Sequence, residues 1–230
     1  MSTGSNPDTV NRDSPGPDSP GPNSIGSDST GSEPTGPDPA PRLTAGAERI
    51  LEVASELFYW RGIHAVGVDT IAAESGVTKR TLYNRFGSKD ALVTTYLQAR
   101  DRRWRALVLA QLDQTSDPVR RVLTPFDVLP DWLAGSSRGC SFVNAFAELP
   151  DPEHPGRQLV IAEKTWLRDL FHRLLVEAGA SEPDTLAAQL LSLHEGALVN
   201  YSIVDDNAAV PTARAAAETL VTKALPDSAD

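Results

Sequence analysis

Residues 66–89 read VGVDTIAAESGVTKRTLYNRFGSK, and their pattern predicts two short helices joined by a tight turn. Val68 and Ile71 are three residues apart, so they share one buried face of the first helix. Gly76 is suited to the left-handed conformation that ends a helix, and Thr78 is suited to capping the next one. The stretch therefore predicts a helix-turn-helix.

The second of these helices has an apolar back and a polar front. Leu82 and Phe86 are four residues apart and pack on the same side, which leaves the other side free to face outward. The outward side chains are basic, hydroxylated, phenolic or amide-bearing: Lys79, Arg80, Thr81, Tyr83, Asn84 and Arg85. Such a surface suits insertion into the major groove of DNA. Our candidates for base-edge contacts are Lys79, Arg80, Thr81 and Arg85, with Arg best suited to guanine.

The end of the second helix adds a candidate phosphate contact. Gly87 breaks the helix, Ser88 is suited to capping the next one, and Lys89 falls in the first turn of that next helix. A cation is unfavourable at the positive end of a helix dipole. The position of Lys89 makes more sense if a DNA phosphate joins it.

Two segments carry a resemblance to a known family. TLYNRFGSKDAL at residues 81–92 and DTIAAESGV at residues 69–77 resemble the TetR/AcrR family of bacterial transcriptional regulators, within a match over residues 47–100. The resemblance implies that Tyr83 and Lys89 hold phosphates, with Thr78 as a further contact. The family usually has Ser or Thr where this chain has Gly67, so a hydroxyl cap is missing there. The alternative is a small helical hairpin with a solvated basic face.

Charge and composition agree with a DNA-binding head on an acidic body. The net charge is −10 overall but +3 over residues 45–105, the only positive part of the chain, which favours phosphate binding there. The single cysteine excludes an intramolecular disulfide and favours a reducing compartment. We find no apolar run of about 18 residues and no signal-peptide pattern, so we expect a cytoplasmic protein without a membrane span.

The periodicity predicts an all-α fold in three parts. Residues 1–43 are rich in Pro, Gly, Ser and Asp and are expected to be a disordered tail, either inert or an acidic interaction segment. Residues 44–92 are expected to form a three-helix DNA-binding head. Residues 93–230 are expected to form a body of roughly six helices for ligand binding and dimerisation, including one helix over about 117–135.

The sequence offers no catalytic or metal-binding constellation. It has no Gly-rich phosphate loop and no cysteine pair, and its four histidines are not paired at ligand spacing. We therefore expect no enzyme activity, no cofactor and no metal site. Cys140 is interpreted as an inert buried thiol or, alternatively, as a sensor of oxidants or electrophiles.

Aromatic side chains in the body predict a pocket for a small, largely apolar ligand. The candidate lining residues are Trp132, Phe142, Asn144, Phe146, Trp166, His172 and Tyr201. The acidic body argues against an anionic ligand. The alternative is that these aromatics simply fill a core.

The last two helices are the predicted dimer interface, because two recognition helices must reach successive major grooves. The resemblance points to the same pair, forming a four-helix bundle across the two-fold axis. The candidate interface residues are Leu190, Leu193, Ala197, Ala216 and Leu220, which alternatively close the core of a monomer. The hypothesis is a homodimeric repressor released from a palindromic double-stranded DNA operator by an unknown small-molecule effector. The rivals are an architectural DNA-binding protein and a regulator without an effector.

Overall fold

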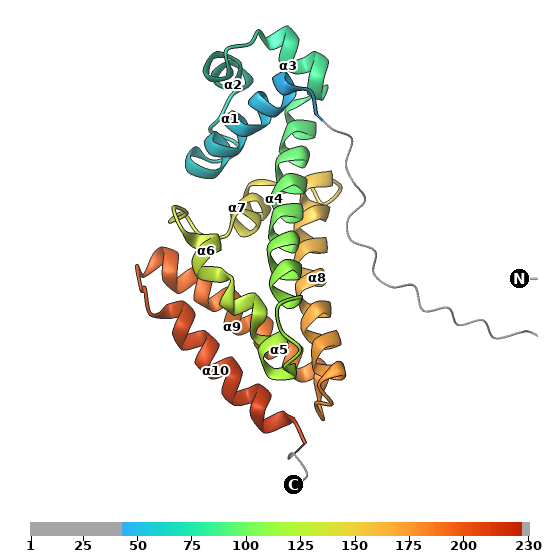
Figure 1. The fold of residues 1–230 in the computed structure, drawn as a ribbon. Coiled ribbons are helices and arrows are strands. Elements are labelled where there is room, and N and C mark those ends of the chain that lie inside the picture. The colour runs from blue at the N-terminus through green and yellow to red at the C-terminus, as the bar shows by residue number, and fades with distance from the viewer. Residues whose placement is uncertain (1–42, 227–230) are drawn as a thin grey trace, which may run out of the picture. The chain divides into compact units, whose positions relative to one another are not determined.

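A computed structural model describes residues 43–226 of the protein (Figure 1). These residues form helices α1 to α10 and contain no strand, so the all-α prediction is confirmed. The predicted disordered tail, apart from Leu43, lies outside the described residues. Within residues 43–226, no helix has both the length and the apolarity that a bilayer crossing requires.

The head consists of α1 (Ala45–Arg61), α2 (Val68–Ser75) and α3 (Lys79–Phe86). The predicted turn between α2 and α3 is confirmed by its backbone and its cap. Gly76 is left-handed with φ 71° and ψ 24°, which a residue without a Cβ adopts at no steric cost. Thr78 Oγ1 accepts a hydrogen bond from the Thr81 N–H at 3.1 Å and so begins α3.

Helix α4 (Lys89–Leu112) is shared between the head and the body (Figure 1). Ser88 caps it by accepting a hydrogen bond from the Ala91 N–H, as the sequence predicts. Its first half buries Leu92, Val93 and Leu97 in the core of the head, and its second half buries Trp104, Val108 and Leu112 in the core of the body. The two cores therefore meet within α4, further along the chain than residue 92.

The body packs six further helices with the second half of α4. They are α5 (Pro118–Asp127), α6 (Leu129–Leu133), α7 (Ser141–Glu148), α8 (Pro155–Glu177), α9 (Pro183–Ile203) and α10 (Ala209–Ala224). The single helix expected over residues 117–135 is divided into α5 and α6. Pro130 has no N–H to continue the hydrogen-bond ladder, which explains the break near Val128.

A second connection joins the head to the body, at the end of α1. The Tyr59 hydroxyl donates to the Gly139 carbonyl oxygen at 3.3 Å and accepts from the Arg138 N–H at 2.9 Å. Arg138 Nη1 donates to the Tyr59 carbonyl oxygen at 2.5 Å, and Glu148 Oε2 accepts from the His64 N–H at 2.7 Å. We call these five residues the head latch. It ties α1 to the segment at residues 137–140 and to α7.

Gly139 is required in the latch for two reasons. Its φ of 84° is unfavourable for a side-chain-bearing residue, and an added Cβ would lie 3.0 Å from Ser202 Oγ on α9. Gly135 has a similar φ of 74°, but an added Cβ there would meet nothing within 4 Å.

Comparing alanine substitutions at Gly135 and Gly139 therefore distinguishes the cost of backbone strain from the cost of steric contact. We expect Gly135→Ala to lower the free energy of unfolding by about 1–2 kcal/mol through strain alone. Gly139→Ala should cost more, because it adds the collision with Ser202. Urea unfolding of both variants measures the difference, and equal losses at the two positions would contradict the close packing at Gly139.

Candidate DNA interface, dimer groove and ligand cavity

The outward face of α3 is built by the burial of its opposite side. Leu82 is fully buried and Phe86 packs against the head core, so the intervening residues are turned to the surface. The predicted DNA contacts lie on α3, at its cap or at the start of α4, and all are exposed or partly exposed: Thr78, Lys79, Arg80, Thr81, Tyr83, Asn84, Arg85 and Lys89. The structure brings them together on one surface, and their contact with DNA stays a prediction.

One of these side chains already has an anionic neighbour. Lys79 Nζ lies 2.6 Å from Asp69 Oδ1 on α2, and both side chains are more than half exposed. An exposed ion pair of this kind contributes about 0–1 kcal/mol, so Lys79 can exchange Asp69 for a phosphate at little cost. The hydroxyls of Thr78 and Thr81 lie 3.0 Å apart, which orders both side chains at the start of α3.

The body contains a cavity of about 400 Å³ between α7 and the C-terminal half of α9. Its lining includes the segment at residues 137–140, Val143 and Asn144 on α7, and Glu195 and Ser202 on α9. Arg138 and Gly139 belong both to this lining and to the head latch. A ligand in the cavity would therefore touch the segment that holds the end of α1.

A buried charged cluster lies behind one wall of the cavity. Lys164 Nζ is 2.8 Å from Glu195 Oε1, 3.0 Å from Glu163 Oε2 and 3.5 Å from Cys140 Sγ. Burial alone would lower the pKa of Lys164, but the neighbouring Cys140, Glu163 and Glu195 raise it, so the ammonium form is retained. Burial raises the pKa of the Cys140 thiol, which favours the inert interpretation of that residue.

The pKa values of the two carboxylates in this cluster are shifted in opposite directions. Burial would raise the pKa of Glu195, but hydrogen bonds and charge from His194 and Lys164 lower it to about 2, so Glu195 is ionised at neutral pH. Burial raises the pKa of Glu163, which is 2% exposed. Glu163 Oε2 has the ammonium of Lys164 at 3.0 Å as an ion-pair partner but makes no hydrogen bond of normal geometry, and His194 Nε2 is buried without a hydrogen-bond partner among the described residues.

The seven residues predicted to line a ligand pocket do not surround one cavity. Only Asn144 lines the cavity described above; the others are Trp132, Phe142, Phe146, Trp166, His172 and Tyr201. Trp132 packs 5.2 Å from the ring of Trp104, and Phe142 is 3% exposed within the head core. Phe146 lies at the surface, and the guanidinium carbon of Arg157 is 3.6 Å from the centroid of its ring.

The remaining members are also occupied elsewhere. The guanidinium carbon of Arg105 lies 4.7 Å from the centroid of the Trp166 ring. Tyr201 packs against the body core. His172 Nε2 lies 3.3 Å from Asp184 Oδ1, and its side chain is 41% exposed. The described chain therefore does not bring the seven residues together around one cavity, because these rings fill cores or cover the surface, and their role in binding a ligand stays a prediction. The sequence reasoning missed Glu195 and Ser202; the signal at Glu195 was the one carboxylate in the otherwise uncharged stretch of residues 185–203 in α9.

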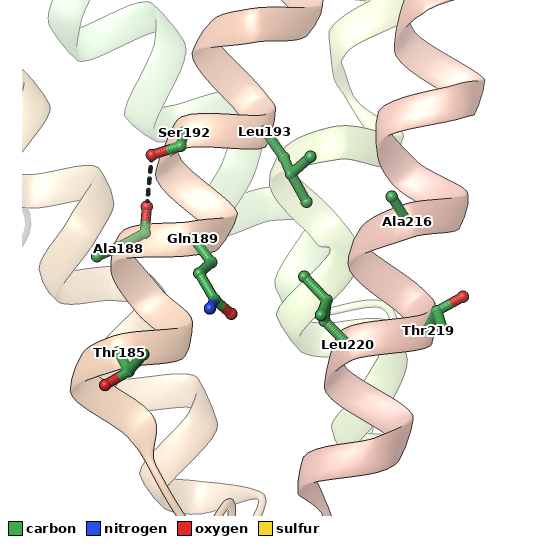
Figure 2. A pocket seen from close by; sticks show the side chains of 8 residues that line it. All are labelled: Thr185, Ala188, Gln189, Ser192, Leu193, Ala216, Thr219 and Leu220. Atoms are coloured by element: carbon green, nitrogen blue, oxygen red, sulfur yellow. Dashed lines mark hydrogen bonds between the residues drawn. The ribbon is translucent and has the colours of Figure 1, made fainter.

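A shallow groove of about 750 Å³ runs along the surface between α9 and α10 (Figure 2). Leu193 on α9 and Leu220 on α10 point into it from opposite sides, and Gln189 projects into it from α9 below Leu193 (Figure 2). Small side chains complete its lining: Thr185, Ala188, Ser192, Ala216 and Thr219. Small residues beside two leucines leave room for a second pair of helices to approach closely.

The predicted interface residues divide into two groups. Leu193, Ala216 and Leu220 line the groove, as an interface requires. Leu190 and Ala197 are 0% and 2% exposed within a single chain, so they are wrong as interface residues. Their positions on α9 face the body core, whereas Leu193 lies on the neighbouring stripe.

Comparisons with known proteins agree with this architecture. A family profile described as "Bacterial regulatory proteins, tetR family" matches residues 50–95. The crystal structure of SCO4454, a TetR-family transcriptional regulator from Streptomyces coelicolor, superposes with a TM-score of 0.75 at 33% identity, covering 79% of this chain and 90% of that one. The protein belongs to the TetR family.

Two further relatives match this TetR-family chain over most of their length. The TetR-type regulator sav143 of Streptomyces avermitilis is 33% identical, with a TM-score of 0.65 and coverage of 79% of this chain and 98% of that one. The transcriptional regulator YjdC of Escherichia coli K12 is 26% identical over 178 residues, which are 76% of this chain and 92% of the relative. The chain is therefore a DNA-binding transcriptional regulator rather than an enzyme.

A phosphate contact at the start of α4 and a base contact on α3 are expected to respond differently to mutation in this TetR-family head. Lys89→Ala should weaken binding to all DNA sites similarly and reduce the salt slope by about one, because it removes a phosphate contact. Arg80→Ala should cost about 1–3 kcal/mol at particular bases and relax the preference there. Fluorescence anisotropy on a selected site and its single-base variants measures both.

Arg168→Ala provides a matched control for these two variants. The substitution removes an exposed positive charge from α8 in the body, where the guanidinium of Arg168 pairs with Asp169. DNA affinity should be unchanged in Arg168→Ala. The assignment of α3 fails if neither head variant differs from this control on the best selected site.

Proposed function

We propose that the protein is a homodimeric repressor that binds a palindromic operator and leaves it when a small molecule occupies the body. The observation that carries the proposal is the double role of residues 137–140. Arg138 and Gly139 form one wall of the cavity and also hold Tyr59 at the end of α1. A ligand that displaces this segment would change the support of the head.

The mechanism is a shift between two populations of the dimer. A ligand changes DNA affinity only if it binds the DNA-incompetent arrangement more tightly than the competent one. The cavity and the latch share Arg138 and Gly139. A change in the latch would therefore change the shape of the cavity, so the two arrangements of the dimer would bind a ligand with different affinities. Helix α4 offers a second route, because it enters both cores.

The names of two relatives bear on the direction of regulation. DhaR of Mycobacterium sp. strain GP1 is named a transcriptional repressor and is 27% identical over 165 residues, or 82% of its length. FasR of Mycolicibacterium smegmatis is named a transcriptional activator and is 30% identical over 115 residues, or 52% of its length. The match to the repressor extends over more of both chains, which favours repression.

A regulator without an effector is the alternative that one observation favours. Trp132 and Phe142, which were expected to line a pocket, are instead packed into the cores. The two functions are distinguished by screening metabolites for their ability to release the protein from the DNA that lies upstream of its own coding sequence. Release by at least one compound supports the sensor, and no release by any compound supports the alternative.

The dimer is tested by a charge placed in the α9–α10 groove. Leu193→Glu should give a monomer with weak operator binding, because the introduced carboxylate would be buried between two copies of the chain. Ile161→Glu is the matched control, since Ile161 is an exposed apolar residue on α8 outside the groove. Light scattering at micromolar concentration reports the mass of each variant, and a folded monomeric wild type would contradict the proposal.

The latch is tested by removing one hydroxyl. Tyr59→Phe keeps the ring and the bond from Arg138 Nη1 to its carbonyl oxygen, but loses the bonds of the hydroxyl to Gly139 and to the Arg138 N–H. Because the ligand would act by weakening this support of the head, the variant should bind the operator more weakly and lower the effector concentration needed for half-release by about tenfold, or 1.4 kcal/mol. Tyr201→Phe makes the same change on α9, outside the latch and the cavity lining. Titration of an effector found in the screen measures both, and equal responses would exclude the latch from signalling.

A further inference from the structure

The cavity between α7 and α9 combines an apolar lining with a small number of polar groups. Val143, Leu198, Val199 and Ile203 supply the apolar surface, and Val143, Val199 and Ile203 are among the exposed apolar side chains of the described chain. The cavity volume of about 400 Å³ lies in the range of sites for small organic ligands. The polar groups that remain free decide which class of ligand it fits.

Three polar side chains of the lining, on α7 and α9, offer free hydrogen-bond acceptors: Asn144, Glu195 and Ser202. Glu195 uses Oε1 for Lys164 and His194, and its Oε2 has no hydrogen-bond partner among the described residues. Asn144 Nδ2 donates to the Arg138 carbonyl oxygen at 3.0 Å, which leaves its Oδ1 to accept. The Ser202 hydroxyl donates to the Leu198 carbonyl oxygen, so its lone pairs are left.

The cationic groups near the cavity are already bound to other partners. Arg138 lines the cavity, but its Nη1 donates to the Tyr59 carbonyl oxygen at the negative end of α1. Lys164 does not line the cavity, and its ammonium lies between Glu163 and Glu195. On α7 and α9, a carboxylate ligand would therefore face the carboxylate of Glu195 and the oxygen acceptors of Asn144 and Ser202.

We propose that this cavity binds a small amphipathic amine, whose ammonium group pairs with Glu195 while its apolar part packs against Val143, Leu198 and Val199. The ammonium would supply the donors that Glu195 Oε2, Asn144 Oδ1 and Ser202 Oγ lack. It would also add a second cation to a cluster in which Glu163 and Glu195 share one lysine. This inference rests on the proposed function, because it names the chemical class of the effector.

The amine would be sensed through the head latch. Asn144 holds the Arg138 carbonyl oxygen, and the same Arg138 donates to Tyr59. An ammonium that draws the Asn144 side chain toward Glu195 would weaken the hold on Arg138. Binding at Glu195 would thereby reach the end of α1 through two consecutive hydrogen-bonded contacts.

Three probes of equal chain length test the class of ligand on the full-length protein without DNA. Octylamine, 1-octanol and octanoate differ only in a cationic, neutral or anionic head group, and calorimetric titration gives their dissociation constants. We expect octylamine to bind at least about tenfold more tightly than the other two, because charge-assisted hydrogen bonds are stronger than neutral ones. Comparable or tighter binding of 1-octanol or octanoate, or no binding of octylamine, would overturn the proposal.

Glu195→Gln is the decisive variant and Glu163→Gln is its matched control. Both remove one carboxylate beside Lys164, but only Glu195 lines the cavity. Glu195→Gln should lose the preference for octylamine over 1-octanol, and Glu163→Gln should keep it. Unchanged octylamine affinity in Glu195→Gln, or an equal loss in both variants, would contradict a site at Glu195.

A third variant covers the case in which a change in the buried cluster prevents folding. Val143→Trp alters an exposed side chain at the cavity, so the fold should be retained, and the added volume should weaken octylamine at least about tenfold. Unchanged affinity would overturn the proposal. Release of the operator is measured in a separate experiment. Binding of octylamine without operator release would contradict only the proposed sensor function. Release by compounds that are not amines would contradict only the amine site.

Discussion

Helix α4 is the element on which the rest of the fold depends, because its apolar residues are divided between two cores. Leu92 and Leu97 are fully buried in the head, whereas Trp104 and Val108 are buried in the body. A single continuous helix cannot rotate at one end without moving the other, since its backbone hydrogen bonds make it a rigid rod. The position of the head is therefore constrained by how α4 packs in the body, and the latch at the end of α1 adds a second point of attachment.

The head could be predicted from the sequence because its determinants are local. Gly76 ends α2, Thr78 caps α3 and Ser88 caps α4, and each acts within four residues of its own position. The outward face of α3 follows from the burial of Leu82 by the same short-range logic. None of these features depends on which distant helix lies nearby, so a pattern of residue types is sufficient.

The cavity between α7 and α9 could not be predicted, because its polar groups come together only in three dimensions. Lys164 and Glu195 are 31 residues apart and lie on different helices, yet their charged atoms are 2.8 Å apart. The aromatic residues misled the prediction because large rings are equally suited to pocket walls and to cores. Trp132 and Phe142 are only ten positions apart, yet they enter different cores. Proximity along the chain therefore carried no information about a shared cavity.

The three faces of α9 indicate which wall of the cavity is free to move. Leu190 and Ala197 face the core, Leu193 faces the groove, and Glu195 and Ser202 face the cavity. A helix that is held by the core on one side, and in the proposed dimer by a second copy of the chain on another, has little freedom to respond to a ligand. The opposite wall at residues 137–140 is a short connection outside any helix, which is hydrogen-bonded to Tyr59 through Arg138 and Gly139 and packs against the cores through Cys140. A ligand that enters the cavity is therefore expected to displace residues 137–140 more readily than α9. This displacement would weaken the support of the head.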